Sequence, residues 1–125
     1  MKKEFKIISE LIKENKRVLD VGCGNGAFTE QIIKHCSPSE VQGIDPSGAQ
    51  IEFAMKRSGV QSASFRSGDA MQLPFEINRF DVATMALVLF FVSDPMRSIT
   101  EMMRVVRSGG LVTAYVWDIH GGGFP

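Results

Sequence analysis

The sequence has little of what marks several protein classes. It holds two cysteines in 125 residues, and Cys23 and Cys36 show neither a disulfide framework nor the spacing of a zinc site. Its 14 basic residues balance its 14 acidic residues without a long run of either sign, so no nucleic-acid or membrane surface built from charge is expected. The longest apolar run, Met85 to Val92, is too short to span a bilayer. The expectation is a cytoplasmic protein without a bound metal.

The composition is that of one globular domain. Hydrophobic residues make up 44% of the chain and charged residues 22%, which is typical of a protein with a buried core. A length of 125 residues suits a single domain. We therefore assign residues 1–125 to one domain, with a core over 17–117 and a glycine-rich tail over 118–125.

Helical and extended patterns alternate along the chain. Apolar residues recur at helical spacing in some segments and form compact runs in others, with Gly and Pro between them. This alternation predicts an α/β fold, a Rossmann-like, doubly wound parallel sheet of about five strands with helices on both faces. The last helix should turn Ile99, Met102, Met103 and Val106 to the core. The expected helices are 3–15, 27–36, 46–59 and 94–106, and the expected strands are 17–21, 41–45, 63–66, 80–87 and, after a turn at 108–110, 111–117.

A glycine-rich loop separates the first predicted strand from the helix that follows it. Gly22, Gly24 and Gly26 can bend sharply and carry no side chain that would hold a ligand away. A loop in this place brings backbone N–H groups and a helix N-terminus to a ligand. The loop alone has two other interpretations, a tight turn without a ligand and a loose dinucleotide-binding pattern that ends at Ala27.

Two acidic residues narrow the choice of ligand. Asp45 ends the strand beside the glycine loop, where a carboxylate can accept both hydroxyls of a ribose, although an acid at a strand end is often a solvated cap. Asp20 lies two residues before Gly22, at the rim of the same pocket, where it would repel a pyrophosphate by roughly 4 kcal/mol at about 4 Å. Water or a helix dipole would soften this repulsion. A cationic ligand without phosphate, such as S-adenosylmethionine, is favoured over NAD.

With these residues in place, the sequence resembles the class I S-adenosylmethionine-dependent methyltransferases, and most closely the type 11 group that includes quinone-biosynthesis enzymes. The resemblance covers roughly residues 17–117, and several motifs in the right order are far more specific than any one of them. The matching stretches are 18–26, 43–47, 68–75, 79–83 and 104–110.

The resemblance implies a set of cofactor-binding residues. In this assignment Asp20 anchors the ammonium of the methionine portion, directly or through water, Asp45 holds the ribose, and Asp69 takes the adenine amino group. The remaining residues are Gly22, Cys23 and Gly24 at the methionine portion, Pro46 and Ser47 beside the adenine, Ala70 and Met71 framing its ring, and Ala86 near the methionine end. Cys23 could also be a nucleophile, but a small residue that fits the turn is the better interpretation.

The chain departs from the family pattern in two places. Ser108 stands where the family usually has proline, which changes the rigidity of a turn more than binding. The family usually has seven strands, so this chain is expected to be truncated, either as a fragment or with the missing surface supplied by a partner. Trp117, Phe124 and an unprotected fifth strand would then favour association between copies of the chain.

Three functional hypotheses remain open from the sequence. The first is an enzyme that transfers a methyl group to a small-molecule acceptor by in-line displacement, a reaction that needs alignment more than a dedicated catalytic residue. No catalytic base is identified. The second is an incomplete domain that only binds the cofactor. The third is an NAD-dependent oxidoreductase, which Asp20 and the stretch 68–70 disfavour.

Overall fold

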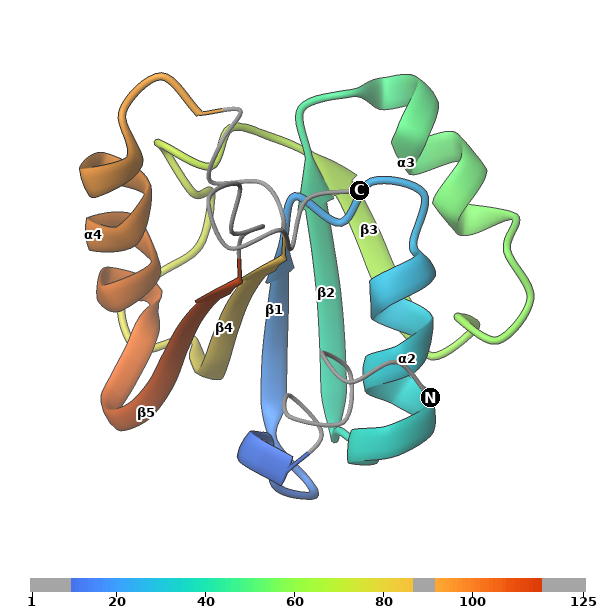
Figure 1. Cartoon of the computed structure of the whole chain (residues 1–125), viewed down its shortest axis with the longest axis horizontal. Coiled ribbons are helices and arrows are strands. Elements are labelled where there is room, and N and C mark those ends of the chain that lie inside the picture. Colours follow the sequence, from blue (N-terminus) through green and yellow to red (C-terminus); the bar gives the residue numbers. More distant parts are fainter. Residues whose placement is uncertain (1–9, 87–91, 116–125) are drawn as a thin grey trace, which may run out of the picture.

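The computed structural model describes residues 10–86 and 92–115. As predicted, strands and helices alternate along this part of the chain, except that a loop without a helix joins the third strand to the fourth (Figure 1). The elements are β1 (Arg17–Val21), α2 (Ala27–Cys36), β2 (Glu40–Asp45), α3 (Gly48–Met55), β3 (Ala63–Ser67), β4 (Phe80–Ala86), α4 (Pro95–Val105) and β5 (Val106–Tyr115).

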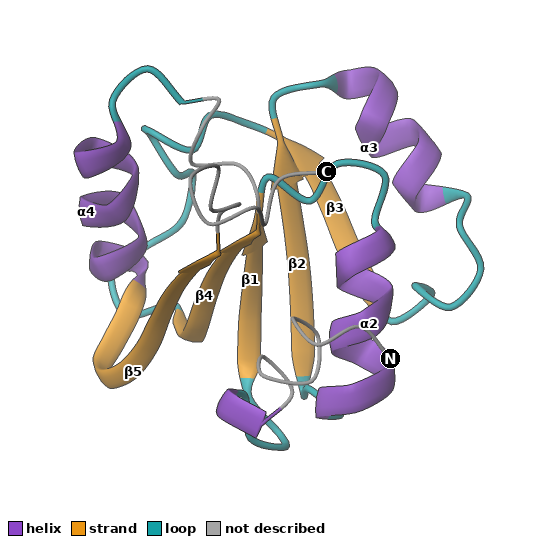
Figure 2. Ribbon diagram, in the orientation of Figure 1, coloured by secondary structure: helices purple, strands orange, loops and turns teal. Residues whose placement is uncertain are grey.

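The five strands form one parallel sheet in the order β3-β2-β1-β4-β5 (Figure 2). The chain runs outward from β1 to β3, then returns to the other side of β1 for β4 and β5. The order of winding therefore reverses at β1. In open sheets of this kind, ligands bind at such a reversal, in the crevice at the carboxyl ends of the strands.

The two faces of the sheet carry separate apolar clusters. Val18 of β1 packs in a cluster with Ile32 of α2, whereas Leu19 packs in another cluster with Met102 of α4. Neighbouring residues of a strand point to opposite faces. The sheet is therefore covered on both faces, which confirms the predicted doubly wound arrangement.

The last strand begins earlier than the sequence predicted. Val106 already aligns with Phe80, and the register then shifts so that Leu111 aligns with Val82. The predicted turn at 108–110 is thus an irregularity inside β5 rather than a loop before it. Gly109 takes a φ of 82° there, and a side chain at Gly110 would meet the backbone oxygen of the neighbouring strand at 2.5 Å.

Smaller differences concern the helices. The predicted helix at 46–59 is shorter, because Ser47 is its N-cap, with Oγ accepting from Gln50 N at 3.3 Å, and the helix ends at Met55. Met103 of α4 is 63% exposed, so its predicted place in the core is wrong. Most of the predicted helix at 3–15 lies outside the described residues.

An ion-pair cluster fastens the amino ends of the strands, opposite the crevice. Asp81 of β4 accepts from the backbone and side chain of Arg17 and from Arg107, at 2.7–3.2 Å. These bonds hold the pKa of Asp81 well below its usual range, the side-chain bond from Arg17 being the largest cause. The carboxylate thereby ties β1, β4 and β5 together.

Replacing Asp81 with alanine should lower the free energy of unfolding by about 1–3 kcal/mol, because it leaves two arginines and one backbone N–H without their acceptor. The loss should shrink as the pH falls below about 3.8 toward the depressed pKa, because the carboxyl of the unfolded wild-type chain is protonated first and this favours unfolding. Urea denaturation at pH 7 and pH 3 measures both effects. Equal stability of the two proteins at pH 7 would contradict this role.

Candidate cofactor-binding site

A cleft of about 410 Å³ opens at the carboxyl ends of the central strands. It lies where β1 and β2 end and where the chain leaves β3, which is the crevice expected from the order of the strands. Asp45 and Asp69 share this cleft. The lining residues are Val21, Gly22, Ile44, Asp45, Pro46, Gly68, Asp69, Ala70, Met71, Val92 and Ser93.

The glycine loop begins at Gly22, immediately after the end of β1. Gly22 N and Cys23 N both donate to Ile44 O of β2, at 2.7 and 3.0 Å, which turns the loop over the end of the neighbouring strand. Gly24 has a φ of 54°, a conformation that L side chains rarely adopt, and the space where its Cβ would stand is open. A ligand can therefore approach the backbone of the loop closely.

The Asp45 carboxylate connects the glycine loop to the turn after β2 at the mouth of the cleft. Its Oδ1 accepts from Gly24 N at 3.1 Å, and its Oδ2 accepts from Ser47 N at 3.0 Å. A carboxylate offers about four acceptor sites, so two or so remain for a ligand that carries hydroxyl groups. A half-buried carboxylate fixed in this way fits the pair of hydroxyls of a ribose.

Asp20 lies beneath the glycine loop rather than in the cleft. It is 1% exposed, and Thr29 Oγ1 of α2 donates to its Oδ2 at 2.6 Å. Because side chains alternate along β1, Asp20 faces α2, whereas the next residue, Val21, lines the cleft. The expected place of Asp20 at the rim therefore differs from the structure.

Burial dominates the electrostatics of Asp20. Loss of hydration raises its pKa to about 7, with a further upward contribution from the charge of Asp45, while the hydrogen bond from Thr29 acts in the opposite direction. The group therefore changes charge near neutral pH. A cation bound close to the glycine loop would favour its ionised form.

The opposite wall of the cleft is the turn after β3. Met71 N donates to Asp69 Oδ1 at 2.8 Å, and Gln72 N donates to Asp69 O at 3.1 Å. Ala70, between Asp69 and Met71 in the sequence, is buried. Met71 is half-buried, and Ser93 Oγ lies 3.4 Å from its sulfur. The Asp69 side chain is thereby held beside an apolar surface.

Cys23 fits the loop as a small buried residue. It is 5% exposed. A Cβ added at Gly43 would stand 3.0 Å from the Cβ of Cys23, so the glycine loop and β2 approach each other closely at this point. Burial and then the charges of Asp20 and Asp45 raise the pKa of its thiol. The protonated thiol at neutral pH disfavours a nucleophilic role.

The structure brings some of the predicted site residues together and leaves others behind the cleft. Ser47 is the N-cap of α3, and Ala86 is the last residue of β4, aligned with Tyr115. The predicted residues that line the cleft are Gly22, Asp45, Pro46, Asp69, Ala70 and Met71, whereas Asp20, Cys23, Gly24 and Ser47 are outside its lining.

Sequence reasoning missed several residues that line the cleft. Val21, Ile44 and Gly68 are sequence neighbours of predicted residues. They could have been predicted in the same way, from their position at or just after the ends of strands. Val92 and Ser93 come from the segment between β4 and α4, which carries no recognisable motif. Only the contact between Ser93 Oγ and the sulfur of Met71 indicates that these two residues reach the cleft.

Over residues 10–86 and 92–115, no three His, Cys, Asp or Glu side chains come together in a way that could ligate a metal ion. In the same part of the chain, no helix has the length and apolar character needed to cross a membrane.

Comparisons with known proteins agree with this geometry. The family model for the methyltransferase domain matches residues 19–114. A demethylmenaquinone methyltransferase from Staphylococcus aureus is 38% identical over 103 residues, which cover 81% of this chain and 43% of that protein. A solved SAM-dependent methyltransferase from Aquifex aeolicus has a TM-score of 0.73 at 25% identity, over 82% of this chain and 57% of that chain.

A third similar protein is named for a different activity. The solved [4+2]-cyclase SpnF has a TM-score of 0.78 at 32% identity, over 87% of this chain and 43% of that chain. The chain spans less than half the length of three curated relatives that it matches, at 42%, 32% and 43%. The family match nevertheless includes the glycine loop, Asp45, Asp69, all of β2 and β3, and β1 from Leu19 onward. The chain belongs to the methyltransferase domain family and is a class I S-adenosylmethionine-dependent methyltransferase domain with a Rossmann-like fold.

Proposed function

We propose that the chain binds S-adenosylmethionine across the carboxyl ends of β1 and β2 and belongs to an enzyme that methylates a small molecule. The observation that carries this proposal is Asp45, whose carboxylate connects Gly24 and Ser47 at the mouth of a cleft that also contains Asp69. This arrangement offers fixed acceptors to the hydroxyls of a ribose and to the amino group of an adenine.

The proposed roles follow from the position of each residue. Asp45 accepts from the ribose hydroxyls, and Asp69 accepts from the adenine amino group, with the ring against Ala70 and Met71 and beside Pro46. The backbone of Gly22 to Gly24 lies along the methionine portion. Asp20 acts on the ammonium from beneath the loop, through the electric field of its carboxylate rather than through a contact in the cleft.

Methyl transfer requires little from the protein beyond alignment of the donor with the acceptor. The bound cofactor supplies a methyl group on a sulfonium, which is a good leaving group. The chain orients the donor by holding its ribose and adenine and shields one side of it from water with Val21, Ile44 and Ala70. No described residue is assigned as a base that removes a proton from the acceptor.

The acceptor is proposed only as a small molecule. The Staphylococcus aureus relative is a demethylmenaquinone methyltransferase, which makes a quinone one candidate acceptor for this chain. One fold can host several activities, as the similarity to a [4+2]-cyclase illustrates. The reaction therefore has to be tested by experiment and does not follow from the fold. A chain that binds the cofactor without transferring methyl groups remains the second candidate.

Titration calorimetry with S-adenosylhomocysteine and with NAD tests the proposal. The two carboxylates in the cleft should accept from the adenosine of the former, which carries no phosphate, and should repel the pyrophosphate of the latter. We expect heat only with S-adenosylhomocysteine. Heat with NAD alone would replace the methyltransferase assignment with a nicotinamide-dependent one.

We also propose that β5 mediates association between copies of the chain. In the described residues β5 is the outer strand beside β4, and no further strand pairs with it. An edge of this kind is a template for pairing with another strand. Sedimentation should show a concentration-dependent dimer that Ala114→Lys shifts toward monomer, since Ala114 is exposed on β5. Identical behaviour of both proteins at all concentrations would reject this edge as the interface.

A further inference from the structure

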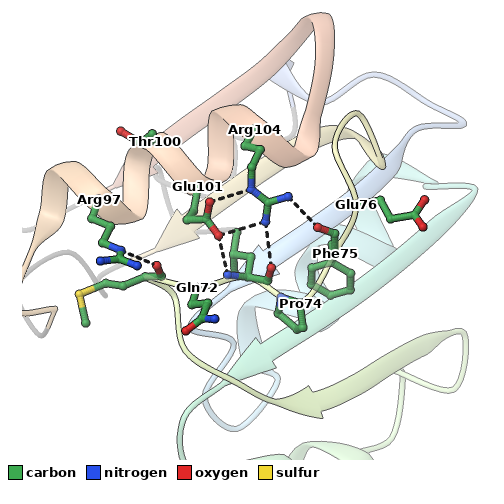
Figure 3. A pocket seen from close by; sticks show the side chains of 10 residues that line it. Gln72, Pro74, Phe75, Glu76, Arg97, Thr100, Glu101 and Arg104 are labelled. Carbon is green, nitrogen blue, oxygen red and sulfur yellow. Dashed lines mark hydrogen bonds and ion pairs between the residues drawn. The ribbon is translucent and has the colours of Figure 1, made fainter.

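Three polar side chains of α4 hold the loop that follows Asp69, Ala70 and Met71, the turn that forms one wall of the cleft. Arg97, Glu101 and Arg104 lie along one side of the helix and point toward the backbone of residues 71–75 (Figure 3). Together they line a groove of about 680 Å³ between α4 and this loop. We call these three residues the α4 clamp.

Arg104 uses its whole guanidinium in the clamp. Its Nε and one terminal nitrogen donate to the Glu101 carboxylate at 2.7 and 3.0 Å. The terminal nitrogens also donate to Leu73 O and Phe75 O, each at 2.9 Å. The rigid planar fork of an arginine can serve several acceptors in one plane, which a lysine cannot do.

Glu101 completes the clamp from the acceptor side. Its Oε1 accepts from Leu73 N at 2.8 Å, so both the N–H and the carbonyl of Leu73 bond to side chains of α4. Arg97 Nε donates to Met71 O at 3.0 Å, one turn earlier on the helix. The backbone of this loop thus takes its partners from the helix, where a strand would take them from its neighbour.

The clamped loop continues directly into the cofactor cleft. Met71 lines both the clamp groove and the cleft, and Asp69 and Ala70 precede it in the turn. Leu73 is 3% exposed in the core cluster that also contains Ala70. Moving the backbone at Leu73 or Met71 therefore moves the wall against which the adenine is proposed to lie.

We propose that Arg104 and Glu101 are positioning residues for the adenine: they fix the 71–75 backbone and thereby the wall formed by Asp69, Ala70 and Met71. This inference rests on the proposed function. It assigns a role in binding the adenosine half of the cofactor to an ion pair that does not line the cleft. The clamp should have no direct part in holding the methionine half.

Calorimetry with two ligands separates this role from general support of the fold. S-adenosylhomocysteine contains both halves of the cofactor, whereas 5′-methylthioadenosine lacks the ammonium and carboxylate. Arg104→Gln should weaken both ligands by a similar factor, roughly tenfold, because a displaced wall affects the adenosine that they share. Glu101→Gln, which keeps the shape of the side chain, should weaken both in the same way by a smaller factor, and it serves as the test if Arg104→Gln does not fold.

Two control variants frame the result. Arg79→Gln breaks a comparable pair with Glu40 at the amino ends of the strands, where its nitrogens donate at 2.6 and 2.8 Å, and should change neither affinity beyond about twofold. Asp20→Asn should weaken S-adenosylhomocysteine more than 5′-methylthioadenosine, because only the former carries an ammonium. This opposite pattern marks a residue that acts on the methionine half.

The outcomes divide clearly. Equal weakening of both ligands by the two clamp variants, with Arg79→Gln near wild type, supports the inference. Unchanged affinities, or a loss confined to S-adenosylhomocysteine, would overturn it while leaving the proposed function intact. A wild-type chain that binds neither ligand would overturn the proposed function itself and this inference with it.

Discussion

Replacing Asp20 with asparagine is expected to stabilise the ligand-free protein at pH 8 by about 2–4 kcal/mol and to weaken S-adenosylhomocysteine at least roughly tenfold. The wild-type carboxylate is buried, and its pKa rises from 3.8 to about 7 on folding. At pH 8 it is ionised in a place that disfavours charge, so unfolding releases it into water. Asparagine has no charge to bury and can still accept the hydrogen bond from Thr29.

The sign of the pH dependence follows from the raised pKa. Below the unfolded pKa both states are protonated, and Asp20 costs no stability. As the pH rises from about 4 to about 7, the unfolded chain ionises first, so the wild type should lose stability relative to Asp20→Asn over this window. Urea denaturation at pH 4, 6 and 8 measures this difference. A variant that is less stable than wild type at pH 8 would contradict the assignment.

Cofactor affinity should respond to pH in the opposite direction. Ionised Asp20 attracts an ammonium above the glycine loop, so wild-type affinity for S-adenosylhomocysteine should rise as the pH passes through about 7. Asp20→Asn should show a flatter profile, and Thr29→Val, which removes the hydrogen bond that lowers the pKa, should shift the wild-type rise to higher pH. Parallel profiles for all three proteins would mean that Asp20 does not sense the ligand.

Replacing Asp45 with alanine is expected to weaken S-adenosylhomocysteine by about 1–3 kcal/mol, the usual effect of removing a buried hydrogen-bonding partner. The variant loses the acceptors for the ribose and also the link between Gly24 and Ser47. Both losses act on the cofactor side of the sheet. Calorimetry at a fixed pH gives the change in affinity directly.

Ser47→Ala is the matched control for Asp45→Ala. It removes the side-chain cap that accepts from Gln50 N, which should lower stability by about 1 kcal/mol. It leaves Ser47 N and the Asp45 carboxylate in place, so affinity should remain near wild type. An unchanged affinity for Asp45→Ala, or an equal loss for Ser47→Ala, would place the ribose elsewhere.

The alternation of elements could be predicted from the sequence because it depends on local patterns. Apolar runs of period two or 3.6, broken by Gly and Pro, gave strands and helices close to those observed. The start of β5 was missed because Val106 and Leu111 align with β4 in two registers, and the stretch between them contains glycines that resemble an ordinary turn.

The site was predictable where it depends on strand ends, and unpredictable where it depends on contacts distant in sequence. Asp45 ends β2 and Asp69 lies two residues after the end of β3, and the topology brings them to one cleft. The burial of Asp20 depends on which face of β1 is covered by α2 at Thr29, which local sequence does not specify. The bond between Glu101 and Leu73 spans 28 residues and has no motif of its own.

A crystal structure of the chain with S-adenosylhomocysteine would test the central claim most directly. We predict that the ribose hydroxyls donate to the Asp45 carboxylate and that the adenine lies against Ala70 and Met71, with its amino group at Asp69. The amino-acid end should lie over the glycine loop, above Asp20. A ligand seated away from the carboxyl ends of β1 and β2, with Asp45 still bonded only to Gly24 and Ser47, would contradict it.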